Sequence, residues 1–298
     1  MSEVSERLRV EWAKGDQARD AGLTTPAYIR RYNDIPYGDD RDWNVLDVYR
    51  NRYKAGKLPV IMLIHGGGWV YGCKELYQYY GMELARRGFA VVNYSYRLAP
   101  EHPFPAQLQD TVAVAAWIMK HADEYGLDTN NVFAVGDSAG AHITGLFCAF
   151  LTDEGYRNQF AFQKPEGFRL RGVGMNCGVY GFEDHENDDG WAERNVLLGD
   201  LLSHPESPAC REQIDVLHLV NRNFPPAYIM TCEGDFLKEQ APFLHSAYEK
   251  AGARSELHIF GSPEHPLYHV FHVTVQEAEG QKCNDEECAF FQGLIGRD

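Results

Sequence analysis

The stretch NVFAVGDSAG (residues 131–140) decides how the fold of this chain is interpreted. It opens with a mostly apolar run, as in a strand that is buried on both faces of a sheet. The segment GDSAG (136–140) then matches the pattern G-x-S-x-G, and a helical pattern follows it. A serine on a tight turn between a strand and a helix is lifted off the sheet toward solvent, so Ser138 is a candidate nucleophile. Ser138 could equally cap the helix that begins at Ala139, and this stretch alone favours neither role.

The alternation of strand and helix patterns recurs along the chain. It predicts the α/β class, with a mostly parallel sheet covered by helices on both faces. We expect strands over 43–50, 58–65, 89–96, 131–138, 171–180, 226–234 and 255–261, and helices over 74–88, 105–126 and 139–155.

A second glycine-rich segment, HGGGW (65–69), follows the second expected strand. Three consecutive glycines cost backbone entropy and need a reason. Ester hydrolysis passes through an oxyanion that needs backbone N–H donors within about 3 Å. The N–H groups of Gly67 and Gly68 can approach such a charge because no Cβ intervenes, and Ala139 N–H would be a third donor. A phosphate-binding turn is the weaker alternative, because no P-loop lysine pattern follows the glycines.

A serine nucleophile needs a base, and the base needs a carboxylate that orients it. Where the nucleophile follows a strand in this way, the acid and then the histidine come later in the chain. Asp235 directly follows the expected strand 226–234 and is the candidate acid, although an Asp in an ordinary turn would look the same. His265, His269 and His272 lie beyond the last expected strand and are the candidate bases.

These motifs, together with YRLAPEHPFPA (96–106) and DFLKE (235–239), resemble those of the hormone-sensitive-lipase-like family of α/β-hydrolase carboxylesterases. The motifs occur in the family's order and span most of the chain. The resemblance implies an α/β-hydrolase fold with a cap built partly from the N-terminus. It also implies hydrolysis of short- to medium-chain carboxylic esters through an acyl-enzyme intermediate, without a cofactor or a metal. The residues implied are Ser138, Asp235 and a downstream histidine as the triad, with Gly67, Gly68 and Ala139 as the oxyanion hole.

The catalytic histidine of the family usually lies in a His-Gly-Phe sequence, which this chain lacks. The nearest forms are HVF (269–271) and HPL (265–267). We predict His269 as the base, because Phe271 matches the family's aromatic residue and Pro266 restricts His265 to extended conformations. Val270 replaces the glycine, and therefore requires either a negative φ or some strain at that position.

The 298 residues are interpreted as one α/β-hydrolase domain, 1–298. Residues 1–25 carry apolar residues at four-residue spacing, which indicates a helix laid over the domain. Residues of about 181–218 form a longer excursion than a crossover between strands requires. We expect both segments to be cap or lid elements.

The composition and charge of the chain limit the kinds of binding partner that we expect. The net charge of −15 argues against a nucleic-acid backbone or an anionic membrane. No apolar run is long enough to span a bilayer. The absence of a secretory pattern and the irregular spacing of the seven cysteines predict a cytoplasmic location. The sequence CNDEEC (283–288) lacks a second metal-binding pair, so no zinc site is expected. The sequence does not indicate an oligomeric state.

The leading functional prediction is a serine carboxylesterase acting on a small-molecule ester. An amidase, such as an arylformamidase-like enzyme, would use the same triad and is the alternative. A catalytically inactive small-molecule receptor on the same scaffold is a third hypothesis, which loss of the base would favour.

Overall fold

The sheet at the centre of the molecule has eight strands in the order β1-β2-β4-β3-β5-β6-β7-β8. The computed structural model describes residues 1–182 and 190–296, so the expected lid segment 181–218 lies partly outside the described residues. β2 is antiparallel to β1 and β4, and the other pairs are parallel. The strands are β1 Ile29–Pro36, β2 Val45–Asn51, β3 Leu58–Ile64, β4 Ala90–Tyr94, β5 Leu127–Asp137, β6 Gly172–Asn176, β7 Ala227–Cys232 and β8 Ser255–Phe260.

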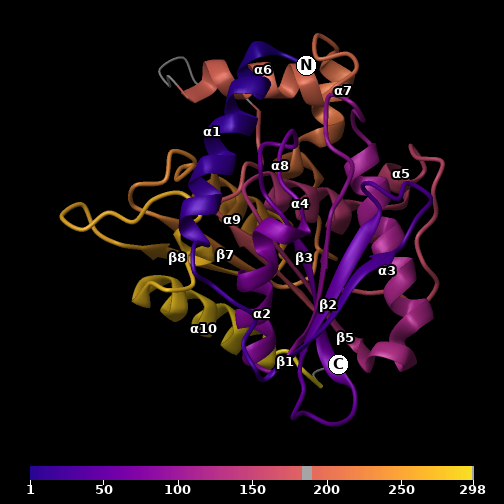
Figure 1. Cartoon of the computed structure of the whole chain (residues 1–298). Helices are drawn as coiled ribbons and strands as arrows, with labels where there is room; N and C mark the ends of the chain where they lie inside the picture. Colours follow the sequence, from indigo (N-terminus) through magenta and orange to yellow (C-terminus); the bar gives the residue numbers. More distant parts are fainter. Residues whose placement is uncertain (183–189, 297–298) are drawn as a thin grey trace.

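Helices cover both faces of this sheet (Figure 1). α3, α4 and α9 pack on one face, and α2 and α10 pack on the other. This is the α/β-hydrolase arrangement expected from the sequence. The helices are α1 Glu3–Arg19, α2 Gln78–Arg86, α3 Ala106–Tyr125, α4 Ala139–Thr152, α5 Glu154–Arg157, α6 Gly190–Leu201, α7 Pro208–Ile214, α8 Val216–Leu219, α9 Gln240–Ala251 and α10 Ala278–Gln292, with short 3-10 helices η1 Lys74–Tyr77 and η2 Phe271–Val273.

The strands expected from the sequence need two corrections. The strand expected over 171–180 ends at Asn176, because Cys177 has a φ of 46° and turns the chain out of the sheet. Strand β1 was not expected from the sequence. This strand lies at the edge of the sheet with β2 as its one neighbour, so exposed charged residues such as Arg30 interrupt its apolar pattern.

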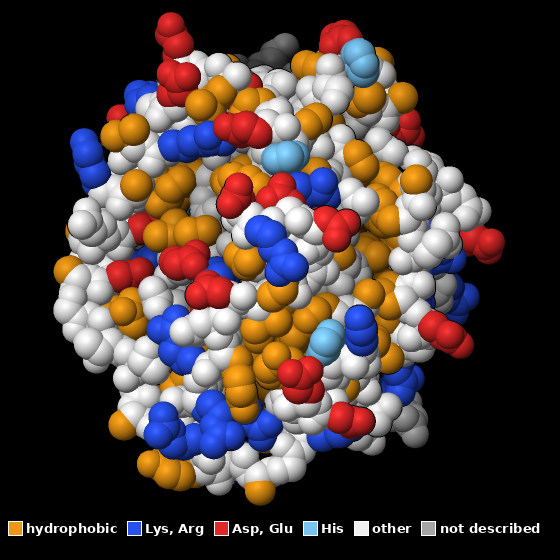
Figure 2. Space-filling view, turned by 45° about the vertical axis from the view of Figure 1, so that its right-hand side comes forward, with side chains coloured by type: hydrophobic (Ala, Val, Ile, Leu, Met, Phe, Trp, Pro, Cys, Tyr) orange, Lys and Arg blue, Asp and Glu red, His pale blue; other side chains and the backbone are white. Residues whose placement is uncertain are grey.

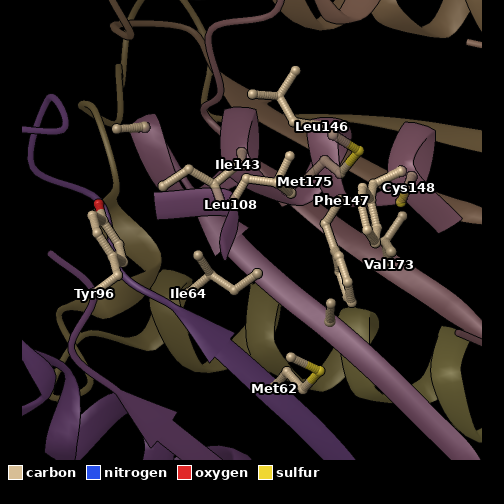
Figure 3. Close-up of a cluster of buried hydrophobic side chains, with 14 of the residues drawn as sticks. Met62, Ile64, Tyr96, Leu108, Ile143, Leu146, Phe147, Cys148, Val173 and Met175 are labelled. Carbon is tan, nitrogen blue, oxygen red and sulfur yellow. The ribbon is translucent and has the colours of Figure 1, made fainter. Parts of the chain in front are cut away.

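The largest core cluster fixes α4 against the sheet (Figure 3). All α4 residues from Ala139 to Leu151 are buried. A helix that is apolar all round must be covered on every side, and α3, α5 and α8 pack beside α4. The helix that follows Ser138 is therefore held in a close-packed environment. The side chains drawn from this cluster include Met62, Ile64, Leu108, Ile143, Leu146, Phe147, Val173 and Met175.

The parallel strands end at the same edge of the sheet, and their following loops meet there. Ligand sites in such sheets lie outside these carboxyl ends. The loops after β3, β5, β7 and β8 carry HGGGW, Ser138, Asp235 and His269 respectively. The fold thus gathers the sequence-predicted residues on one side of the molecule.

The surface on the face shown in Figure 2 mixes acidic, basic and apolar side chains. Within the described residues, no helix combines the length and apolarity that crossing a bilayer demands.

Candidate active site

Ser138 lies on a strained turn between β5 and α4. Its φ of 51° and ψ of −119° are unusual for a residue with a side chain. Its hydroxyl makes no capping hydrogen bond to the helix, which speaks against the capping role. The motif glycines are required by the backbone itself. A Cβ on Gly136 would overlap the Gly140 carbonyl, and one on Gly140 would overlap the Ile64 carbonyl.

The glycine-rich turn after β3 folds back on its own backbone. The N–H groups of Val70 and Tyr71 both donate to the Gly67 carbonyl, at 3.1 and 2.9 Å. Gly67, with a φ of 109°, has no room for a Cβ because the Tyr71 carbonyl lies there. The sequence suggested that glycine is needed at position 67 to admit a substrate oxygen. The folded turn adds a second reason, which is the contact with the Tyr71 carbonyl. Within the described residues, the N–H groups of Gly67 and Gly68 donate no hydrogen bond to another protein group.

Tyr77 connects this turn to the residue before the nucleophile. Its hydroxyl accepts from Gly66 N–H at 2.9 Å and donates to Asp137 Oδ2 at 2.7 Å. Burial raises the pKa of Asp137 to about 6, although the hydrogen bond from Tyr77 opposes the shift. The sequence analysis missed both residues. A polar Asp137 at the end of an apolar strand was a signal for one, whereas nothing in the sequence marked Tyr77.

His142 on α4 supports the other end of the same turn. Its Nδ1 accepts from Trp69 Nε1–H at 3.1 Å, so its Nε2 carries the hydrogen and donates to the Ile214 carbonyl at 2.7 Å. Burial lowers the pKa of His142 to about 4, which keeps the imidazole neutral. Trp69 has a φ of 64°, so this hydrogen bond anchors a residue in a strained conformation.

Asp235 and His269 are in direct contact. His269 Nδ1 lies 2.7 Å from Asp235 Oδ1, and Thr231 and the Leu237 N–H also donate to this carboxylate. Burial opposes ionisation of Asp235, but hydrogen bonds from His269 and from the Leu237 N–H help to outweigh it and hold the pKa of Asp235 below its usual range. An ionised carboxylate can only accept, so Nδ1 of His269 carries the hydrogen.

The loop that carries His269 is held next to Asp235 by backbone pairing. Gly234 N–H donates to the Leu267 carbonyl at 2.8 Å, and Gly234 and Tyr268 form a β-bridge. Val270 adopts a φ of 54°. Of the two outcomes expected for a valine in the family's glycine position, the structure therefore has the strained one.

The other two candidate histidines lie elsewhere. His265 is exposed and forms a tight turn with Ser262 through its backbone. His272 is fully buried and packs edge-on against Tyr80, with ring centroids 5.2 Å apart. Neither lines the cavity that contains Ser138.

A cavity of about 600 Å³ joins these groups, a size typical of small-molecule sites. Ser138, Ala139, Gly67, Gly68 and His269 line its base. We call α1 and α6 the roof helices, because they pack against each other and both contribute lining residues (Figure 1). The lining residues of the roof helices include Leu8, Trp12, Asp16, Arg19, Arg194 and Leu197.

Charges from α1 that line the cavity are paired with neighbours. Arg19 Nη1 lies 2.7 Å from Asp16 Oδ1, and Tyr71 donates to Asp16 Oδ2 at 2.8 Å. Arg19 also donates to the Leu76 carbonyl at 2.6 Å, which ties the end of α1 to the segment below. The roof is therefore joined to the glycine-rich turn through Tyr71.

Cys177, Asp235 and His269 could in principle hold a metal, since their ligand atoms lie within 4.8 Å of one another. However, Asp235 Oδ1 and His269 Nδ1 already share a hydrogen at 2.7 Å, and a metal would have to displace it. This arrangement fits an oriented base better than a metal centre. Cys283 and Cys288 of the CNDEEC segment are both buried on α10.

Several curated relatives of the chain carry esterase names. Esterase LipC of Mycobacterium tuberculosis is 29% identical over 235 residues, covering 75% of this chain and 56% of that protein. Tuliposide A-converting enzyme b3 of Tulipa gesneriana is 30% identical over 243 residues, covering 78% of this chain and 61% of the relative. The chain thus spans little more than half of the length of the curated relatives that it matches.

Solved structures share the fold over nearly the whole chain. Esterase B from Lactobacillus Rhamnosis superposes with a TM-score of 0.89 at 24% identity, covering 98% of this chain and 95% of that one. The carboxylesterase EstE1, from a metagenomic library, gives a TM-score of 0.78 at 22% identity, with 98% of each chain covered. These likenesses show an α/β-hydrolase fold.

A family model described as BD-FAE matches residues 46–246, which is more than half of the chain. The match includes HGGGW, GDSAG and Asp235. The chain therefore belongs to the BD-FAE family, and this membership, with the esterase names of its relatives, confirms its resemblance to the hormone-sensitive-lipase-like α/β-hydrolase carboxylesterases.

Proposed function

We propose that the protein is a serine carboxylesterase that hydrolyses short- to medium-chain carboxylic esters. The observation that carries the proposal is the 2.7 Å contact between Asp235 and His269. The two residues are 34 positions apart, and His269 lines the same cavity as Ser138 and the glycine-rich turn. An acid, a base, a nucleophile and N–H donors facing one cavity are the parts that acyl transfer needs.

The reaction proceeds through an acyl-enzyme. His269 Nε2 takes the proton of the Ser138 hydroxyl as its oxygen attacks the ester carbonyl, while Asp235 stabilises the imidazolium. The N–H groups of Gly67, Gly68 and Ala139 donate to the oxyanion. His269 then gives the proton to the departing alcohol. Water, deprotonated by the same histidine, releases the acid and restores Ser138.

The lining of the cavity favours an uncharged substrate. Leu8, Trp12, Leu197 and Leu237 are apolar. Of the charged lining residues, Asp16 pairs with Arg19 and Glu11 with Arg7, and the Arg194 guanidinium lies over the ring of Phe182. The names of the relatives support ester hydrolysis. The Asp235–His269 pair supports catalysis over a receptor role, since the receptor hypothesis requires a lost base.

Hydrolysis of p-nitrophenyl butyrate tests this proposal. We expect the wild-type protein to turn the ester over and Ser138→Ala to lower kcat by about 10⁴ to 10⁶, because the triad acts as a unit. Chelators should have no effect, since the chain supplies the base and the oxyanion donors. Retention of more than a tenth of the wild-type rate by Ser138→Ala, or metal-restorable loss in EDTA, would contradict the proposal.

A further inference from the structure

Phe236 is an exposed aromatic residue at the edge of the cavity. Its side chain follows Asp235 directly and is 65% exposed, although phenylalanine is normally among the buried residues. It lines the cavity, and its ring centroid lies 4.4 Å from that of His269, with the planes tilted by 45°. One face of the catalytic base is therefore covered by a phenyl ring that still has much of its surface open to solvent.

The chemistry of the base determines which half of a substrate lies near this ring. In ester hydrolysis the histidine that accepts the serine proton must next protonate the oxygen of the departing alcohol. That oxygen must come within hydrogen-bond reach of His269 Nε2. The group attached to it is then placed beside the imidazole and the Phe236 ring.

The carbonyl oxygen of the ester is directed to a different part of the cavity. It must reach the N–H groups of Gly67 and Gly68. A Cβ on Gly68 would lie 3.0 Å from Leu197 and 3.2 Å from Trp12, so the roof helices cover this part of the turn. The roof side therefore differs from the side next to His269, where Phe236 is exposed.

We propose that Phe236 forms an alcohol-side subsite for an uncharged aromatic group. The inference rests on the proposed esterase function and names the class of alcohol that the site accepts. Leu237 and Val270, which also line the cavity, make the surroundings of the ring apolar. An aromatic alcohol group would cover the exposed ring and pair with it in an offset or edge-on arrangement.

Two butyrate esters that differ in their alcohols test the subsite. Benzyl and cyclohexylmethyl groups have similar size and both leave as weakly acidic primary alcohols, so the main difference between the two esters is the aromatic ring. We expect the wild-type protein to favour benzyl butyrate by about three- to tenfold in kcat/KM, as aromatic pairing predicts. Phe236→Leu should bring the ratio close to one. Phe243→Leu, at an exposed phenylalanine of α9 that does not line the cavity, is the matched control and should leave the ratio unchanged.

Other results would overturn the proposal in distinguishable ways. An unchanged ratio in Phe236→Leu, or an equal fall for both esters, would reduce Phe236 to a shield over the Asp235–His269 pair. A preference that follows the acyl half, measured with methyl phenylacetate against methyl cyclohexylacetate, would move the subsite to the roof side. Absence of turnover of every ester by the wild-type protein would refute the proposed function itself.

Discussion

The base of the cavity and its roof are built in different ways. At the base, the backbone fixes each position: a Cβ on Gly67 would overlap the Tyr71 carbonyl, and one on Gly140 would overlap the Ile64 carbonyl. Where the roof covers the glycine-rich turn, side chains make the contacts, and the atoms nearest to a Cβ on Gly68 would belong to Trp12 and Leu197. The comparison indicates that the chemistry depends on backbone geometry, whereas the fit of the substrate depends on side chains that can be exchanged.

The largest effect is expected at the base of the cavity, from the histidine that contacts Asp235. His269→Ala should lower kcat by about 10⁴ or more, because no group would then accept the serine proton or donate a proton to the leaving oxygen. His265→Ala should leave kcat within about twofold, since His265 is exposed and lies outside the cavity. Steady-state kinetics on one ester compare the two variants. A reversed pattern would assign the role of base to His265.

A smaller difference is expected between two neighbouring glycines. Gly67→Ala should lower kcat by about 10² or more, because the added Cβ forces the turn away from the oxyanion. Gly68→Ala should cost less, because the side chains nearest to its Cβ, from the roof helices, can yield, although its φ of 57° also disfavours an alanine. The ratio of the two kcat values is the measurement. Equal losses would show that the roof is as rigid as the base.

A roof residue should affect substrate affinity more than chemistry. Trp12 lines the cavity and packs edge-on against Tyr71, with centroids 5.8 Å apart. We expect Trp12→Ala to raise KM for a butyrate ester by about three- to tenfold through lost apolar contact, with kcat changed less. If kcat fell a hundredfold with KM unchanged, the roof would share in the chemistry and the contrast would fail.

The smallest effect on activity is expected from Glu287, a buried carboxyl group that lies beneath the base of the cavity. Glu287 accepts from Asn176 Nδ2 at 2.8 Å, and the Asn176 carbonyl accepts from Ser138 N–H at 2.9 Å. Burial raises the pKa of Glu287 to about 7, although hydrogen bonds from Asn176 and Tyr80 oppose the shift. Between about pH 4.5 and 7 the folded protein therefore binds more protons than the unfolded chain, and this group makes the free energy of unfolding fall as pH rises.

Glu287→Gln should remove that contribution. The free energy of unfolding of the variant minus that of the wild type should therefore rise by about 2 kcal/mol when the pH is raised from 5 to 8. Urea unfolding at the two pH values measures the gain, and Asp137 is present in both proteins, so its titration largely cancels. If the difference in unfolding free energy between Glu287→Gln and the wild type did not change with pH, Glu287 would be ionised in the folded protein at both pH values.

The contrast between positions fixed by the backbone and positions fixed by side-chain contacts also explains which features could be predicted from the sequence. Glycines required by backbone contacts leave a fixed pattern, so Ser138 and the glycine-rich turn could be proposed from GDSAG and HGGGW alone. Tyr77 and His142 could not, because their contacts join residues 60 and 73 positions apart and depend on the folded arrangement of ordinary side chains. The edge strand β1 was missed for a related reason, since an exposed edge does not impose a regular apolar pattern.

The proposed catalytic base, His269, lies between these two cases. Val270 holds a φ of 54° where a glycine would be expected, so the usual sequence mark of this turn is absent. The contact with Asp235 and the place in the cavity separate His269 from His265. That contact depends on the pairing of Gly234 with the loop before His269. The number of residues in a loop does not reveal such pairing.

The central claim is that Ser138, activated by His269, performs the chemistry. Labelling with a fluorophosphonate, followed by intact-mass measurement and peptide mapping, tests it most directly. We predict a single adduct on Ser138, formed at least a hundredfold more slowly in His269→Ala and at the wild-type rate in His265→Ala. An adduct on another residue, or undiminished labelling of Ser138 in His269→Ala, would contradict the account.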